Sequence, residues 1–114
     1  MSLYPGVQSK GQEELDAVLG KGRMLMFDDH PSLPYIEAIF REVMRWHPAI
    51  LMGGSHESIK DIVYGDYYIP KVGTTIYANI WAMTHDPSVH KDPECFIPER
   101  HLRKNGHFEN INSI

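Results

Sequence analysis

The residues with the clearest chemical pattern are Glu42 and Arg45, two side chains of opposite charge that stand three positions apart shortly before Pro48. On a helix they fall about 60° apart, away from the apolar stripe of the same segment. In water such a pair contributes only about 0.2–0.5 kcal/mol. Under a second layer of protein the pair would need a third partner, because an uncompensated buried charge is strongly destabilising. Spacing alone favours the solvated pair and leaves the covered pair open.

The cysteine and the histidines offer little for a metal site. A single cysteine, Cys95, excludes an internal disulfide framework and a multi-cysteine zinc site. His85 and His90 stand five positions apart, and His101 and His107 stand six apart. No cysteine or carboxylate at a suitable spacing completes a tetrahedral set around either pair. We therefore predict no metal ligands in this chain.

Length and composition place the chain among small globular domains or pieces of larger ones. It has 114 residues, of which 42% are hydrophobic, so wholesale disorder is not expected. The net charge is −4 and the basic residues are scattered, which argues against a nucleic-acid partner. The sequence contains no run of eighteen apolar residues, so we expect no transmembrane segment. The first residues lack the charged and apolar regions of a signal peptide.

Two amphipathic helices are predicted, over residues 7–19 and 33–47. Gly20 supplies the end of the first helix. Pro48 ends the second, because the residue before a proline is driven out of the helical region. The stripe of the second helix follows the i, i+3, i+4, i+7 rule and consists of Ile36, Ile39, Phe40, Val43 and His47.

The second half of the chain is predicted to be mostly extended. Residues 59–80 contain turn signals between β-branched and aromatic runs, which predicts the strands of a small antiparallel sheet, with the best strand over 74–80. Residues 87–102 are expected to form a short helix and a long irregular segment, and 103–114 a frayed polar tail. The expected fold class is mainly α with a small antiparallel β-sheet (α+β), in one partial domain over 1–114.

An ordered series of motifs along nearly the whole chain, from about Tyr4 to Leu102, resembles the C-terminal half of a cytochrome P-450, a haem-thiolate monooxygenase. The likeness is greatest to fungal microsomal members. One Glu-x-x-Arg motif alone is weak, whereas the series in order is highly specific. The motifs are Glu42-x-x-Arg45, Ile69-Pro70, Asn79-x-Trp81-Ala82, His85-Asp86-Pro87 and Asp92-Pro93-x-x-Phe96-x-Pro98-Glu99-Arg100.

This resemblance implies a partial cytochrome P-450 fold and assigns roles to several residues. It makes 7–19 similar to the end of helix J, 33–47 to helix K, and the last segment to the entrance of the meander. It also implies that Glu42, Arg45 and Arg100 form the structural triad of the family, with Arg100 as the missing third partner. The triad would be a charge-assisted network that locks the meander over the proximal side of the haem.

Several expected parts of the family pattern do not occur in the sequence. The oxygen-activating helix and the loop with the axial cysteine are absent, so no catalytic residue is assigned, and Cys95 is not taken as the iron ligand because it lacks flanking glycines. His56 is the candidate for cofactor binding, at a haem propionate, although Glu57 follows it where many relatives have an arginine. His101 stands where the family usually has phenylalanine.

The functional interpretation is a truncated piece of a haem-dependent monooxygenase, which by itself is expected to be inactive. A full-length relative would bind iron and haem, insert one oxygen atom from O₂ into an apolar organic substrate, and take electrons from an NADPH-dependent reductase. Such relatives are held on the endoplasmic reticulum membrane, which leaves the localisation of this chain undefined. The alternative is a non-catalytic scaffold or binding remnant of a split or decayed gene.

Overall fold

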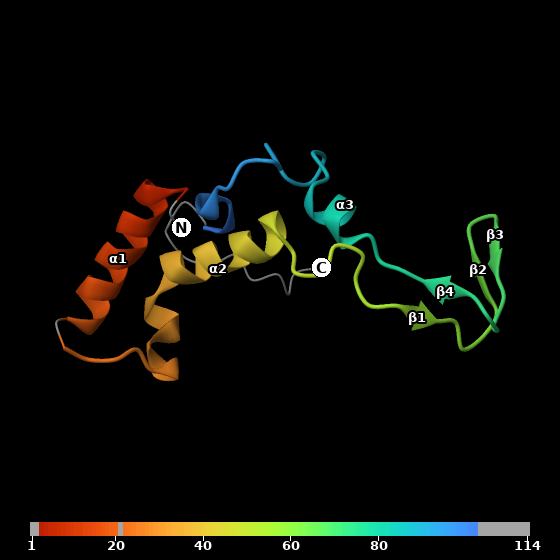
Figure 1. The fold of residues 1–114 in the computed structure, drawn as a ribbon, viewed down its shortest axis with the longest axis horizontal. Helices are drawn as coiled ribbons and strands as arrows, with labels where there is room; N and C mark the ends of the chain where they lie inside the picture. The colour runs from red at the N-terminus through yellow and green to blue at the C-terminus, as the bar shows by residue number, and fades with distance from the viewer. Residues whose placement is uncertain (1–2, 21, 103–114) are drawn as a thin grey trace. The chain divides into compact units, whose positions relative to one another are not determined.

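The computed structural model describes residues 3–20 and 22–102, and the predicted frayed tail 103–114 lies outside the described residues. The chain divides into two compact units (Figure 1). The first, here called the helical unit, comprises Met1–Trp46 and Glu94–Ile114; the second, the strand unit, comprises His47–Pro93. Their contents confirm the predicted class, mainly α with a small antiparallel β component.

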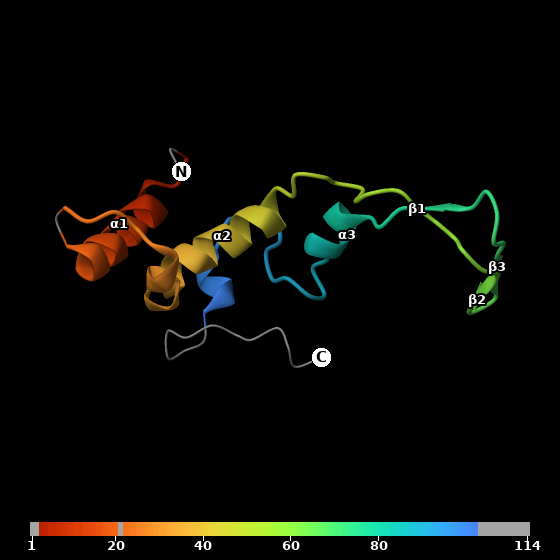
Figure 2. The ribbon, with the colours of Figure 1, turned by 90° about the horizontal axis from the view of Figure 1, so that it is seen from below.

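Two helices, α1 (Pro5–Leu19) and α2 (Pro34–Trp46), pack side by side in the helical unit (Figures 1 and 2). Each begins with a proline in its first turn, where the missing N–H costs nothing. The packing is close at Gly11, the one residue of α1 that is fully buried. A methyl group there would lie 3.2 Å from the terminal side-chain carbons of Ile36 and Ile39. The glycine therefore sets the distance between the two helices.

The connector between these helices is more regular than the sequence suggests, because it contains the 3₁₀ helix η1 (Phe27–Ser32). Asp29 organises it by accepting a hydrogen bond from the N–H of Met26 at 2.9 Å and by pairing with Arg23 at 2.7 Å. A second 3₁₀ helix, η2 (Pro98–His101), packs on α2 and brings the end of the irregular segment 87–102 onto that helix (Figure 2).

The strand unit contains two short antiparallel ladders. One of them is a hairpin that joins β2 (Ile62–Tyr64) to β3 (Tyr67–Ile69), with Tyr64 opposite Tyr67. Gly65 in its turn has a positive φ of 57°, which glycine adopts without strain. The other ladder pairs β1 (His56–Glu57) with β4 (Thr75–Ile76). Figure 1 shows β2 and β3 between β1 and β4 along the chain, so that the hairpin forms the turn-side end of this excursion of the backbone.

Two predicted elements of the strand unit require correction. The strand expected over 74–80 is reduced to Thr75–Ile76, because Asn79 instead caps the helix α3 (Ile80–Thr84) and accepts a hydrogen bond from the N–H of Ala82 at 3.0 Å. The short helix expected from residue 87 is only a turn, closed by the N–H of His90 donating to the carbonyl of Asp86 at 2.8 Å. No helix among the described residues is long and apolar enough to cross a membrane.

Candidate functional site

The central feature of the helical unit is the buried carboxylate of Glu42, whose side chain is 0% exposed. Arg45, one turn later on α2, approaches it with two nitrogens: Nε donates to Oε2 at 2.9 Å and Nη2 donates to Oε1 at 2.8 Å. The Arg45 side chain is itself only 5% exposed. This is the fork geometry that makes arginine–carboxylate pairs strong and directional. The pair is therefore covered by protein. The interpretation that spacing alone favours, a pair in contact with solvent, is wrong.

The third partner comes from η2, which is more than fifty residues away along the chain. Arg100 Nε donates to Glu42 Oε1 at 3.1 Å. The backbone N–H of Ile97 donates to the same oxygen at 2.9 Å. Both arginines also reach the carbonyl of Cys95, with Nη2 distances of 3.2 Å from Arg45 and 3.3 Å from Arg100. The structure thus brings the three residues of the expected triad together, along with two backbone groups of the segment 94–101.

A fourth side chain, His101, completes the set around Glu42. Its Nε2 atom lies 2.9 Å from Glu42 Oε2, and the side chain is 19% exposed. Because an ionised carboxylate only accepts hydrogen bonds, the imidazole Nε2 is the donor. Each oxygen of Glu42 consequently has more than one partner. The sequence analysis did not predict this contact. The one signal for it is that position 101 carries histidine, a possible hydrogen-bond donor, where the family usually has phenylalanine.

The network keeps its carboxylate ionised. Burial raises the pKa of Glu42, but hydrogen bonds from Arg45, from the N–H of Ile97 and from His101 outweigh burial and hold the pKa at about 2. Burial also lowers the pKa of His101, Glu42 opposes this effect, and Arg100 and Arg41 lower it further. The site therefore combines one carboxylate, two guanidinium groups and a histidine whose neutral form is favoured.

Aromatic packing anchors the same segment at its beginning. The Trp46 indole Nε1 donates to the carbonyl of Glu94 at 2.8 Å. The ring centroids of Trp46 and Phe96 lie 5.7 Å apart, and those of Tyr4 and Phe96 lie 4.9 Å apart. The segment 94–101 is therefore attached to the last turn of α2 by an aromatic cluster and to its middle by the charged network. Such an arrangement fixes the path of the chain and offers no reacting group.

The buried face of α2 is the charged face rather than the predicted apolar stripe. Ala38, Glu42 and Arg45 are the buried residues of this helix. In contrast, Phe40 is 60% exposed and Val43 is 41% exposed. Periodicity identified an apolar side of the helix but not which side the rest of the described chain covers.

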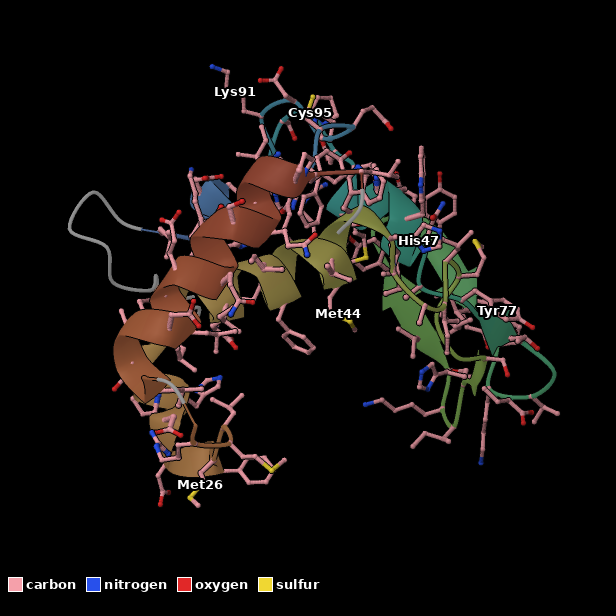
Figure 3. All side chains as sticks on the ribbon, turned by 60° about the vertical axis from the view of Figure 1, so that its left-hand side comes forward. Met26, Met44, His47, Tyr77, Lys91 and Cys95 are labelled. Atoms are coloured by element: carbon pink, nitrogen blue, oxygen red, sulfur yellow. The ribbon has the colours of Figure 1, made fainter. Side chains whose placement is uncertain are left out.

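An apolar groove of about 460 Å³ lies between η1 and the start of α2 in the helical unit. Met26 is one of its lining residues, and Figure 3 shows Met44 projecting outward from α2. Phe27, on the same side, is 99% exposed. Large apolar side chains left open to this extent mark a surface that another layer of protein usually covers. The groove is lined by Leu25, Met26, Phe27, His30, Leu33, Ile36, Glu37 and Phe40.

Polar contacts also tie α1 to α2 and η2. Glu14 on α1 accepts hydrogen bonds from the backbone N–H groups of Tyr35 and Ile36, both at 2.9 Å. Lys10 pairs with Glu99 at 2.6 Å, and the Tyr35 hydroxyl donates to the same carboxylate at 3.1 Å. Neither contact was predicted, since partners this far apart in sequence leave no local pattern.

The remaining candidate residues lie elsewhere. His56 is exposed in β1, opposite Ile76, and the Glu57 carboxylate accepts a hydrogen bond from the N–H of Gly73 at 3.4 Å. The Cys95 thiol is exposed, and Figure 3 shows it at the outer edge of its loop. It is the Cys95 carbonyl that the network uses.

The donor set of the described residues does not fit a complete haem site. A thiolate that binds haem iron needs a shielded position, whereas the only cysteine is solvent-exposed on the loop held by Arg45 and Arg100. Within the described part of the chain, no three histidine, cysteine or acidic side chains gather as metal ligands.

Comparison with known proteins gives consistent matches. The sequence model of the family described as Cytochrome P450 matches residues 1–113. The chain is 47% identical over 106 residues, 93% of its length, to cytochrome P450 monooxygenase claR of Ampulloclitocybe clavipes. It is also 47% identical over 102 residues, 90% of its length, to O-methylsterigmatocystin oxidoreductase of Aspergillus flavus. These matches cover 20% and 19% of the two relatives, so the chain spans about a fifth of their length.

A solved structure shows the same fold. The chain superposes on a zebrafish cytochrome P450, solved with abiraterone, with a TM-score of 0.83 and 38% sequence identity. The match covers 88% of this chain and 24% of that one. The family model and the fungal relatives confirm the predicted resemblance to fungal members, and the solved structure confirms the partial cytochrome P450 fold.

Proposed function

The chain belongs to the cytochrome P450 family, and from this premise we propose that it forms the part of a haem-dependent monooxygenase that holds the meander against helix K. In this proposal α2 is the helix K equivalent and residues 94–101 are the start of the meander. Glu42, Arg45 and Arg100 act as a structural triad rather than as catalytic groups. We propose that the chain by itself is inactive, because the side chains of this network fix the backbone and are not placed to act on a substrate.

The observation that carries this proposal is the environment of Glu42. A carboxylate without solvent exposure receives one arginine from its own helix, and a second arginine and a backbone N–H from the segment 94–101. A network of this kind requires well-defined geometry, since a lost partner would leave an uncompensated buried charge. It suits a scaffold that must keep its shape next to a large cofactor.

The open apolar surfaces support the view that this chain works as part of a larger assembly. Phe27, Phe40 and Val43 stay exposed on the helical unit, and an isolated soluble domain rarely leaves such a surface open. We infer that these faces pack against further layers of a complete monooxygenase. In the alternative, a non-catalytic remnant, these apolar side chains would stay exposed to water or would pack against a different protein.

The cofactor, partners and location follow from the family as proposals for the complete protein. Haem would supply the oxygen chemistry, and an NADPH-dependent reductase would supply electrons for inserting one oxygen atom into an apolar organic substrate. His56 is proposed to lie near a haem propionate. The endoplasmic reticulum membrane is the proposed location, as for fungal microsomal members.

Sequencing the transcript that carries this reading frame tests the proposal first. We expect it to continue upstream into an oxygen-activating helix and downstream into a loop with a Phe-x-x-Gly start and an axial cysteine. The encoded protein, expressed with haem, should then give the reduced carbon monoxide difference spectrum of a thiolate-ligated iron. A matched variant with that cysteine replaced by serine controls for haem bound elsewhere.

The opposite result separates the two candidate functions. A transcript that encodes only these 114 residues, together with a purified product that takes up no haem, would contradict the monooxygenase proposal. In that case the scaffold remnant would be favoured, and its test is whether the product unfolds cooperatively in urea. An aggregated product would argue against the scaffold as well, because its apolar faces would have no partner.

A further inference from the structure

His101 ends η2 at a point where its ring faces the buried carboxylate of Glu42. The Nε2 atom lies 2.9 Å from Glu42 Oε2, whereas Arg100, the residue before it, donates to Oε1 at 3.1 Å. Two consecutive residues of η2 therefore engage the two oxygens of one carboxylate. A phenylalanine ring at position 101 would fill similar space but could not donate a hydrogen bond.

The donor role fixes one form of the imidazole. The pKa of Glu42 is held at about 2, so Oε2 is an acceptor at any ordinary pH, and Nε2 must carry the hydrogen. Oε2 has Arg45 Nε as its other side-chain donor, at 2.9 Å. Neutral His101, protonated on Nε2, satisfies this oxygen without adding charge.

Burial is the main reason why a second proton on the ring is disfavoured; Glu42 opposes this effect, and the charges of Arg100 and Arg41 add to it. The charge of Arg41 acts on the ring from α2 and that of Arg100 from η2, while Arg45 pairs with Glu42 at 2.8 Å. Glu99, also on η2, is paired with Lys10 of α1 at 2.6 Å. A proton on Nδ1 would thus add a further cation to a partly buried site whose single central carboxylate already meets two guanidinium groups.

We propose that His101 is a positioning residue for Glu42 that works in its neutral form, so that the attachment of residues 94–101 to α2 weakens when the ring takes up a proton. The triad of the family does not include this contact, and the proposal concerns an interaction within this chain that does not require bound haem. Its outcome is therefore separate from that of the proposed monooxygenase function.

Hydrogen exchange of the intact gene product, followed by mass spectrometry, tests this proposal. The peptide covering 94–102 reports the N–H of Ile97, which donates to Glu42. Wild type is compared with His101→Gln, whose amide nitrogen has a reach like that of Nε2, and with His101→Asn, which is one methylene shorter. Neither amide titrates. The comparison is made at about pH 7.5 and about pH 5.5, on either side of the ordinary histidine pKa of about 6.5.

At about pH 7.5, wild type and His101→Gln should protect this peptide equally, and His101→Asn should lose about tenfold or more of the protection. At about pH 5.5, wild type should lose protection relative to His101→Gln. A peptide over residues 62–69, in the strand unit, should exchange alike in all three proteins. Equal protection in wild type and His101→Gln at both pH values would overturn the proposal. If His101→Asn does not fold, the wild-type and His101→Gln comparison still decides.

Discussion

The carboxylate of Glu14, on α1, accepts a hydrogen bond from the backbone N–H of Tyr35, on α2, at 2.9 Å. Its second oxygen accepts from the N–H of Ile36 at the same distance. Since α2 begins with Pro34, which has no N–H, these are the first free donors of that helix. A neighbouring helix therefore supplies the cap that residues just before a helix usually provide, with a negative charge at the favourable end of the helix dipole.

Replacing Glu14 should weaken the joint between α1 and α2. Glu14→Ala leaves two amide donors without their acceptor, and we expect a loss of about 0.5–2 kcal/mol in the free energy of unfolding. Urea denaturation followed by tryptophan fluorescence measures this loss. Glu13→Ala is the matched control, because Glu13 is exposed on the same helix. Equal losses in the two variants would show that the cap does not contribute.

Arg45 should tolerate lysine far less well than Arg41 does. Lysine cannot reproduce the fork that reaches both Glu42 and the Cys95 carbonyl, so Arg45→Lys should cost about 1.5–3 kcal/mol of the free energy of unfolding. Arg41 pairs with Glu37 at 2.7 Å in a more exposed position, and Arg41→Lys should cost less than about 1 kcal/mol. Both variants replace an arginine that pairs with a glutamate, and the two arginines differ in how far they are buried. Urea denaturation compares their free energies of unfolding. An equal cost would refute the buried network.

Gly11 should accept no large side chain. Gly11→Leu would drive the new atoms into Ile36 and Ile39, where even a methyl group would sit at 3.2 Å, and we expect a loss of about 1–3 kcal/mol. Gly6→Leu, in the same helix, meets nothing within 4 Å and should change the free energy of unfolding by about 0.5 kcal/mol or less. Thermal unfolding ranks the two. A stable Gly11→Leu protein would mean that α1 packs against α2 differently.

The stability of the helical unit should depend on acid pH through Glu42. Its folded pKa, about 2, lies below the ordinary value of 4.5, so the unfolded chain binds more protons in this window. The contribution of this group is therefore complete above about pH 4.5 and is lost as the pH falls toward about 2. Glu42→Gln should be less stable at neutral pH, by about 3–5 kcal/mol, and should lack this part of the pH dependence. Parallel slopes for both proteins would contradict the assignment.

Local features of the fold were accessible from the sequence. Pro5 and Pro48 mark where α1 begins and where α2 ends, within a residue or two of the predicted ranges. The i, i+3 spacing placed Glu42 and Arg45 within reach of each other on one helix. Arg100 could be added only through the motif series, because nothing in local spacing connects positions 58 residues apart.

The parts that sequence reasoning missed depend on long-range contacts. The strand expected over 74–80 is interrupted because the Asn79 side chain caps a helix, and asparagine is compatible with either outcome until its partner is known. The buried side of α2 carries Glu42, since η2 brings Arg100 and His101 to it. Hydrophobic patterning alone assigns such a side to solvent.

At three positions the segment 94–101 meets α2 through main-chain groups, so the attachment there does not depend on which side chains the positions carry. The carbonyls of Glu94 and Cys95 and the N–H of Ile97 are groups that every residue except proline possesses in full. Side chains at these three positions can drift over generations while the attachment survives. A single inserted or deleted residue would instead move all three groups out of register. The attachment therefore constrains the number of residues in the segment more tightly than the identities of residues 94, 95 and 97.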